Sequence, residues 1–211
     1  MSTITVVCLG DSTTAGTPLF KSPVESPPGG EGDEQSQFAY WLQRAHPEWQ
    51  VLNRGVNGER SDEIERRFDR DVIAHSPRVV VIIAGVNDVY QGHDASHVTG
   101  RLRAMYDLSG AAGISVVAGT IVPYNTATAG QNEQMHAVNA WITEEARRDS
   151  NLLAVDTRSA VAAADNSDRL AGSPDGLHPD IEGYRRMAEA LEPAIARAIA
   201  RESTHDAHFS E

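Results

Sequence analysis

The chain has 211 residues, which is enough for one well-buried domain and too few for two of ordinary size. Apolar residues make up 40% of it and charged residues 23%, a balance that excludes general disorder and fibrous repeats. The net charge of −12 argues against nucleic acid as a partner, because phosphate contacts require a basic face. We expect one domain over residues 1–201 and a flexible tail over 202–211.

The start of the chain shows no targeting signal. MSTITVV lacks the charged and long apolar regions of a signal peptide, and no apolar run approaches the roughly 20 residues that span a bilayer. We therefore expect no membrane span and a cytoplasmic location. The single cysteine, Cys8, lies in the first apolar run, where we expect a small hydrophobic residue without a chemical role. The sequence indicates no particular oligomeric state.

Five short β-branched runs alternate with amphipathic stretches along the chain. Each run is apolar almost without alternation, which is typical of parallel strands covered by helices on both faces. The pattern predicts a doubly wound α/β domain. The predicted strands are 4–9, 50–54, 78–84, 114–120 and 152–157.

Apolar residues recur at helical spacing between these strands. A cap and acidic first turn at Ser61 predict one helix over 61–75. Further helices are predicted over 96–111, over 131–148 and from near Asp180, the last kinked or interrupted at Pro193.

Residues 18–35 are rich in proline, glycine and acid, and they lie outside this alternation. The composition predicts a long loop near the end of the first strand. We expect it to cover or flank the functional site.

Polar residues and glycines follow the predicted strands, at the edge where open α/β sheets bind ligands. Asp11 and Ser12 follow the first strand, Asn57-Gly58 the second, Asn87-Asp88 the third, and Asp175-Gly-Leu-His178 comes after the fifth. Acyl transfer needs a nucleophile, a base, a group that orients the base, and donors for an oxyanion. These strand ends supply all four.

The residue types indicate a role for each position. Ser12 is the candidate nucleophile, His178 the base and Asp175 the acid that orients it, because the acid and the base stand three positions apart across a glycine turn. The candidate oxyanion donors are the backbone N–H groups of Ser12 and Gly58 and the side-chain amide of Asn87.

The segments GDST (10–13), NRGVNGE with Gly58, GVND with Asn87, and DGLHP with Asp175 and His178 resemble the four sequence blocks of the SGNH/GDSL hydrolase superfamily. The resemblance runs from residue 10 to 179. It implies a flavodoxin-like three-layer α/β/α sandwich and a serine esterase, thioesterase, lysophospholipase or carbohydrate deacetylase. It also implies the triad and the oxyanion donors at the positions given above.

Alternatives of other classes are weaker. A Ser/Thr-rich turn after the first strand can cradle the phosphate of a flavin or nucleotide, but Asp11 places a negative charge there. His205 and His208 could grip a stray cation, whereas Asp175 and His178 lack an obvious third ligand for a catalytic metal. A binding module that has only kept the fold would predict a broken triad.

We expect a serine hydrolase that cleaves carboxylic esters through an acyl-enzyme and needs no metal or organic cofactor. The low aromatic content, 6%, favours a small-molecule ester with a short acyl chain, and polar residues near the strand ends favour a small or carbohydrate alcohol. A thioesterase or a lysophospholipase with the same triad is the alternative. Candidate substrate contacts are Arg54, Glu59, Arg60, Tyr90 and Tyr124.

Overall fold

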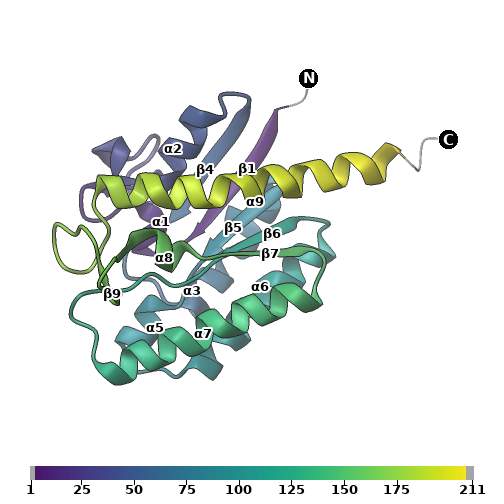
Figure 1. Ribbon diagram of the computed structural model, residues 1–211. Helices are drawn as coiled ribbons and strands as arrows, with labels where there is room; N and C mark the ends of the chain where they lie inside the picture. The colour runs from purple at the N-terminus through teal and green to yellow at the C-terminus, as the bar shows by residue number, and fades with distance from the viewer. Residues whose placement is uncertain (1–2, 208–211) are drawn as a thin grey trace.

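A five-stranded parallel sheet forms the centre of the computed structural model, which describes residues 3–207 and the side chains as far as Arg201 (Figure 1). The strand order is β4-β1-β5-β6-β7, which is second, first, third, fourth, fifth along the chain. This is the flavodoxin-like order, so the predicted doubly wound fold is confirmed. The strands are β1 (Ile4–Gly10), β4 (Trp49–Gly55), β5 (Val79–Ile83), β6 (Ser115–Gly119) and β7 (Leu152–Val155).

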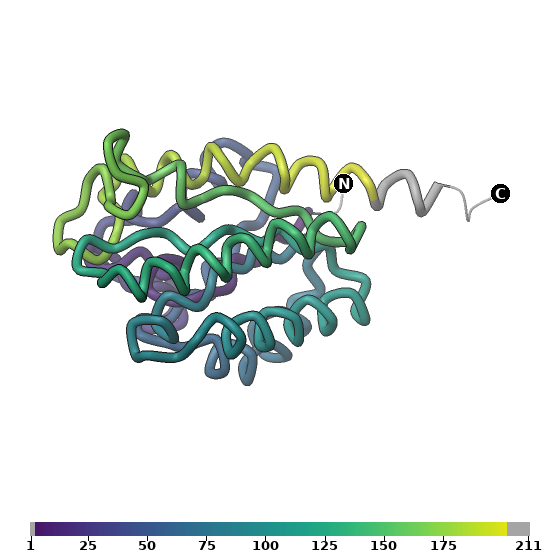
Figure 2. Tube along the Cα trace, turned by 60° about the horizontal axis from the view of Figure 1, so that its bottom comes forward, coloured from purple at the N-terminus to yellow at the C-terminus, as the bar shows by residue number. Residues whose placement is uncertain are grey.

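Helices cover both faces of the sheet, and each strand therefore contributes to two hydrophobic cores. In β1, Val7 and Leu9 face one core while Val6 and Cys8 face the other, because successive side chains point to opposite faces. Figure 2 shows α9 and α6 on opposite sides of the molecule. One face is covered by α2 (Phe38–Ala45) and α9 (Ile181–Ala207), the other chiefly by α6 (Ala95–Ala111) and α7 (Ala129–Arg148).

The helix predicted over 61–75 is interrupted twice, so the prediction of one continuous helix is wrong. It consists of α3 (Ser61–Arg66), α4 (Phe68–Asp71) and a short 3-10 turn, η2 (Ile73–His75). The first break falls at Arg67, whose φ of −101° and ψ of 8° leave the helical range. Its side chain is buried and donates hydrogen bonds to backbone carbonyls at the carboxyl ends of β1 and β4. Helical periodicity does not predict such long-range hydrogen bonds.

Helix α9 begins at Ile181, close to the predicted start, and continues through Pro193 without interruption. Proline lacks the N–H of the helical hydrogen bond, but Leu191 and Ile195 on either side of it are fully buried and hold the helix against the core. The backbone of α9 reaches Ala207 and so enters the predicted tail. The remainder of that tail, 208–211, lies outside the described residues.

The segment 18–35 is more ordered than a long loop. Strand β2 (Phe20–Lys21) pairs with β3 (Glu31–Gly32), and a 3-10 turn, η1 (Glu34–Ser36), follows. The Ser22 hydroxyl donates to the carbonyl of Gly55 at 2.6 Å, which ties the segment to the edge strand β4. The segment therefore covers one edge of the sheet.

Several short elements were not predicted, and most of them lie at the carboxyl edge of the sheet. Strands of two or three residue pairs and single helical turns carry too little periodicity to be recognised in a sequence. Helix α2 was also missed. The short elements are α1 (Ser12–Ala15), α5 (Val86–Tyr90), α8 (Thr157–Val161) and the hairpin of β8 (Ala162–Ala163) and β9 (Asn166–Leu170).

The carboxyl ends of three strands lie level with one another. Gly10 at the end of β1 pairs with Gly55 of β4 on one side and with Ile83 of β5 on the other. Strand order reverses between β1 and β5, and ligands bind at such a switch point in open α/β sheets. Within residues 3–207, no helix is long and apolar enough to cross a membrane.

Candidate active site

Ser12 is the first residue of α1, directly after the end of β1. The carboxylate of Asp11 caps this helix and accepts a hydrogen bond from the N–H of Thr13 at 2.9 Å. Since the N–H groups of a first helical turn have no partner within the helix, the Ser12 N–H is free to bind an anion.

His178 connects Ser12 to Asp175. Its Nε2 lies 2.9 Å from the Ser12 hydroxyl oxygen, and its Nδ1 lies 2.7 Å from Oδ2 of Asp175. If Nδ1–H donates to the carboxylate, Nε2 is the acceptor of the serine proton. The three side chains therefore form one continuous chain from carboxylate to hydroxyl, as the sequence predicts.

The loop 171–180, which we call the base loop, fixes Asp175 beneath the imidazole. The second carboxylate oxygen, Oδ1, accepts from the backbone N–H groups of Leu177 at 2.8 Å and His178 at 2.9 Å. Partial burial on its own would raise the pKa of Asp175, but the hydrogen bonds from His178 and from these N–H groups hold the pKa below its ordinary value. Asp175 therefore stays ionised and keeps Nδ1 protonated.

The predicted oxyanion donors come from three segments: Ser12 begins α1, Gly58 lies in the loop after β4, and Asn87 lies in α5. Asn87, in α5, donates one amide hydrogen to the carbonyl of Glu59 at 2.9 Å, which leaves its second hydrogen available. Gly58 has a φ of +79° and open space where a Cβ would lie. It does not line the cavity itself, whereas its neighbour Asn57 does.

Asp11 is the most strongly perturbed acid beside the nucleophile. It is 1% exposed, and its Oδ2 is buried without a hydrogen-bond partner among the described residues. Burial raises the pKa of Asp11 to about 7, the N–H of Thr13 opposes that shift, the charge of Asp88 adds to it and the charge of Arg67 opposes it. The carboxyl directly before Ser12 therefore titrates within the physiological range.

A cavity of about 180 Å³ opens in front of Ser12. Tyr90 and Tyr124 meet edge to face in its wall, with ring centroids 5.8 Å apart. Tyr90 is 56% exposed, whereas Tyr124 is only 3% exposed. The cavity is lined by Ser12, Thr13, Asn57, Val86, Asn87, Tyr90, Tyr124, Leu177 and His178.

Only two of the five candidate substrate contacts line the cavity. Tyr90 and Tyr124 line the cavity as expected. Arg54 instead lines a separate groove beside the 18–35 segment, the Glu59 carboxylate binds Arg67, and Arg60 binds Asp62 and Gln91.

The 18–35 segment supplies no lining residue of the cavity. It contacts the site through the Glu25 carboxylate, which accepts from the backbone N–H of the lining residue Asn57 at 2.9 Å. Of the two expected arrangements, the segment flanks the site and does not cover it, because its polar side chains bind the edge strand and the following loop.

Sequence reasoning gave no role to four lining residues and missed one buried cation. Val86 and Leu177 lie inside the motifs GVND and DGLHP, so their position at strand ends was the available signal. Thr13 and Asn57 adjoin predicted residues in the same way. Arg67 has a local ion pair with Asp71, but its bonds to the strand ends follow from no local pattern, because their acceptors are the backbone carbonyls of Gly10 and Arg54.

One group within the described residues has ligand atoms close enough for a metal ion, namely Asp62, Asp88 and His97. Both carboxylates already have partners, since Asp88 accepts from Ser61 at 2.7 and 2.9 Å and Asp62 binds two arginines. The group lies outside the lining of the cavity. The side chains of His205 and His208 lie outside the described residues.

The Ser12 hydroxyl, bonded to the His178–Asp175 pair in a cavity that Asn87 also lines, has the arrangement that serine hydrolases use. Residues 8–186 match the model of the GDSL-like lipase/acylhydrolase family. The chain belongs to this family, which places it among the carboxylic ester hydrolases. The resemblance seen in the four motifs is thereby confirmed. The flavin- or phosphate-binding alternative loses its support.

Similar proteins agree with this family. An acetylxylan esterase from Geobacillus stearothermophilus is 38% identical over 55 residues, a segment that spans 25% of this chain and 25% of the esterase. A structure assigned to the lipolytic G-D-S-L family, from Desulfitobacterium hafniense, is 25% identical with a TM-score of 0.74, covering 91% of this chain and 99% of that one. A mutant of Axe2, an acetylxylan esterase from Geobacillus stearothermophilus, shares the fold at 22% identity and a TM-score of 0.69, covering 94% of each chain.

Proposed function

We propose that this protein is a serine esterase that removes short acyl groups, acetyl foremost, from a small or carbohydrate alcohol through an acyl-enzyme. The observation that carries the proposal is the chain of contacts from Asp175 through His178 to Ser12, at 2.7 and 2.9 Å, in the wall of a cavity. A hydroxyl bonded to a histidine that a carboxylate orients is an activated nucleophile.

In the first half-reaction, His178 Nε2 takes the proton of Ser12 as Oγ attacks the ester carbonyl. The tetrahedral oxyanion receives hydrogen bonds from the N–H groups of Ser12 and Gly58 and from the free amide hydrogen of Asn87. The carbon–oxygen bond to the alcohol then breaks, and the imidazolium gives its proton to the departing alkoxide. A water molecule repeats the sequence on the acyl-serine, releasing the carboxylic acid and restoring the serine hydroxyl.

The size and the walls of the cavity support a short acyl chain. A volume of about 180 Å³ must hold the reacting carbonyl and whatever is attached to it on that side. Val86 and Leu177 add apolar surface to walls that are otherwise lined by polar residues and tyrosines, and the Tyr90–Tyr124 contact joins α5 to the loop after β6 in one wall. Similarity to an acetylxylan esterase supports an acetylated sugar as the substrate class.

Hydrolysis of p-nitrophenyl esters from acetate to decanoate, by wild type and Ser12→Ala, tests both parts of the proposal. We expect the highest kcat/KM with acetate, a fall with chain length, and a loss on the order of 10⁴-fold or more in Ser12→Ala. Ser109→Ala, which changes a buried serine bonded to the Met105 carbonyl, is the matched control and should keep wild-type activity.

Each contrary result has a separate meaning. Activity retained by a folded Ser12→Ala would reject Ser12 as the nucleophile. A maximum at octanoate or decanoate would keep the serine but replace the short-chain substrate by a lysophospholipid or a long-chain thioester. Comparing an oxygen ester with a thioester of the preferred acyl chain length then decides between an oxygen ester and a thioester.

A further inference from the structure

The loop after β4 carries the second oxyanion donor in a tight turn. The N–H of Glu59 reaches back to the carbonyl of Val56 at 3.4 Å, and Gly58 occupies the third position of this turn with a φ of +79°. A type II turn requires positive φ at that position, and its closing hydrogen bond does not use the N–H there. The Gly58 N–H is therefore free, but its direction depends on how the turn is held.

Glu59 links this turn to the third donor. Its backbone carbonyl accepts from Nδ2 of Asn87 at 2.9 Å. An amide NH₂ is planar, so fixing the direction of one hydrogen also fixes the direction of the other. The position of the Glu59 carbonyl therefore sets where the free Asn87 hydrogen points.

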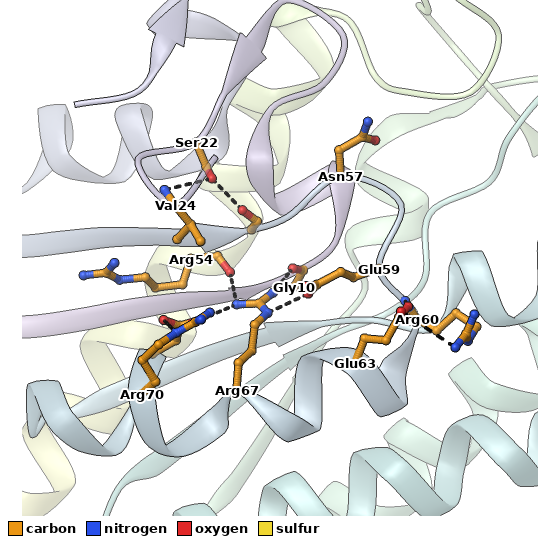
Figure 3. Close-up of polar contacts among 12 residues, drawn as sticks. Gly10, Ser22, Val24, Arg54, Asn57, Glu59, Arg60, Glu63, Arg67 and Arg70 are labelled. Atoms are coloured by element: carbon orange, nitrogen blue, oxygen red, sulfur yellow. Dashed lines mark hydrogen bonds and ion pairs between the residues drawn. The ribbon is translucent and has the colours of Figure 1, made fainter. Parts of the chain in front are cut away.

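The Glu59 side chain is held from below by Arg67, as Figure 3 shows. The Arg67 side chain is 6% exposed, and its Nε donates to Oε2 of Glu59 at 2.6 Å. Its other nitrogens donate to the carbonyl of Gly10 at 2.7 Å, to the carbonyl of Arg54 at 2.7 Å and to the carboxylate of Asp71 at 2.8 Å. One guanidinium thus joins the ends of β1 and β4 to the turn. A guanidinium can do so because its N–H donors spread over three nitrogen atoms, whereas lysine has a single nitrogen.

A second contact binds the same loop to α5. Asp88, next to Asn87, is fully buried and accepts from the N–H of Ser61 at 2.9 Å and from its hydroxyl at 2.7 Å. Residues 59 and 61 are therefore both bonded to residues 87 and 88. These bonds hold the Gly58 turn and Asn87 together, and Arg67 connects them to the strand that precedes Ser12.

We propose that Glu59 is a positioning residue for the oxyanion donors and that Arg67 is its anchor. The inference rests on the proposed function, because it assigns the donors to Gly58 and Asn87. Glu59 does not touch the substrate, since its carboxylate faces Arg67. It acts by fixing the turn that presents the Gly58 N–H and by orienting the amide of Asn87.

Glu59→Gln is the test variant, because it removes the charge while keeping the length and an acceptor oxygen. We expect kcat on p-nitrophenyl acetate to fall about 10- to 100-fold with KM nearly unchanged, since small displacements of catalytic groups cost that much. Glu59→Ala should lose more. Arg67→Lys is not the primary test, because breaking a buried cation network threatens folding.

A double-mutant cycle with Asn87→Ala separates positioning from general damage to the fold. If Glu59 acts through Asn87, the combined variant should lose clearly less than the product of the two single losses. Glu145→Gln is the matched control, because Glu145 is a buried partner of Arg103 between α6 and α7, far along the chain from the site. It should lower the unfolding temperature without changing kcat.

Two results would overturn the proposal: a kcat for folded Glu59→Gln within twofold of wild type, or losses that multiply in the double variant. Ser12→Ala, measured in the same series, keeps the two proposals apart. An inactive Ser12→Ala beside a fully active Glu59→Gln rejects only the positioning role. An active Ser12→Ala rejects the proposed function itself.

Discussion

The base loop and the oxyanion donors are held in different ways. Within the base loop, the Asp175 carboxylate bonds to N–H groups two and three residues away, and the Ser173 hydroxyl donates to the carbonyl of His178 five residues away. The donors instead depend on contacts between distant segments, 57 residues apart for Arg67 and Gly10 and 28 for Asn87 and Glu59.

The two regions also differ in burial. The side chain of Asp175 is 29% exposed, whereas those of Arg67 and Asp71 are 6% and 4% exposed. A buried charge that loses its partner costs several kcal/mol of stability, while an exposed one costs little. The comparison teaches that activity and stability should separate in the base loop and should be coupled around the donors.

The largest expected effect comes from His178→Ala. We expect kcat/KM on p-nitrophenyl acetate to fall on the order of 10⁴-fold or more, because the serine loses its base. The unfolding temperature should stay close to that of wild type, since the shape of the base loop comes mainly from backbone contacts to Asp175. Steady-state kinetics and thermal unfolding of the same samples check both statements.

His136→Ala is the matched control for that experiment. His136 lies 2.7 Å from Asp168 in a second histidine–aspartate pair, outside the lining of the cavity. It should keep wild-type activity. A large loss of stability in His178→Ala would contradict the separation of activity and stability in the base loop.

Asp11→Asn is expected to have the next largest effect, and it acts on stability. The pKa of Asp11 is raised from 3.8 to about 7 in the folded protein, so the folded state binds this proton more tightly than the unfolded state does. The resulting stabilisation is fully present below about pH 4 and is lost as the pH rises through about 7, a change of up to about 4 kcal/mol. Asp11→Asn cannot titrate, so this pH dependence should vanish.

Urea unfolding of wild type and Asp11→Asn from pH 4 to pH 8 measures that difference. Asp165→Asn, a change at an exposed carboxylate, serves as the control and should follow the wild-type curve. A gap between wild type and Asp11→Asn that stays constant over this range would show that Asp11 is ionised throughout. Burial would then disfavour the ionised form of Asp11, beside Arg67 and Asp88, less than we infer.

The same contrast explains how much of the site was predictable from sequence. Asp175 and His178 were predictable because they lie within one motif. Ser12 and Asn87 were predictable because the carboxyl ends of parallel strands lie at one edge of the sheet. The five strands were also predictable, because each continuous apolar run is a local signal in the sequence. Arg67 was not predictable, since its acceptors at Gly10 and Arg54 are backbone carbonyls, which exist at every residue.

Helix boundaries failed for the same physical reason. The apolar spacing at Ile64, Phe68 and Val72 is genuinely helical, and all three residues are buried. The helix breaks nevertheless at Arg67, where bonds to two strand ends outweigh helical periodicity. Local sequence patterns predict which face of a helix is apolar. They do not predict the distant backbone groups that a buried polar side chain such as Arg67 binds.

Ser173→Ala should have the smallest effect and tests the base loop from within. The Ser173 hydroxyl donates to the carbonyl of His178 at 2.6 Å and accepts from the N–H of Gly176 at 2.8 Å. Loss of this hydroxyl should raise the activation free energy by about 1 kcal/mol, a roughly fivefold decrease in kcat/KM. The effect is small because water can replace the lost hydrogen bonds at a partly exposed site.

Ser159→Ala removes a comparable short-range contact, to Asp156 in an exposed turn, and should leave kcat/KM unchanged. If Ser173→Ala instead approached the loss seen in His178→Ala, the orientation of the imidazole would depend on the whole base loop. Asp175 alone would then not suffice to hold His178, and the base loop would be as strongly coupled as the donors. A modest loss at full stability keeps the two regions distinct.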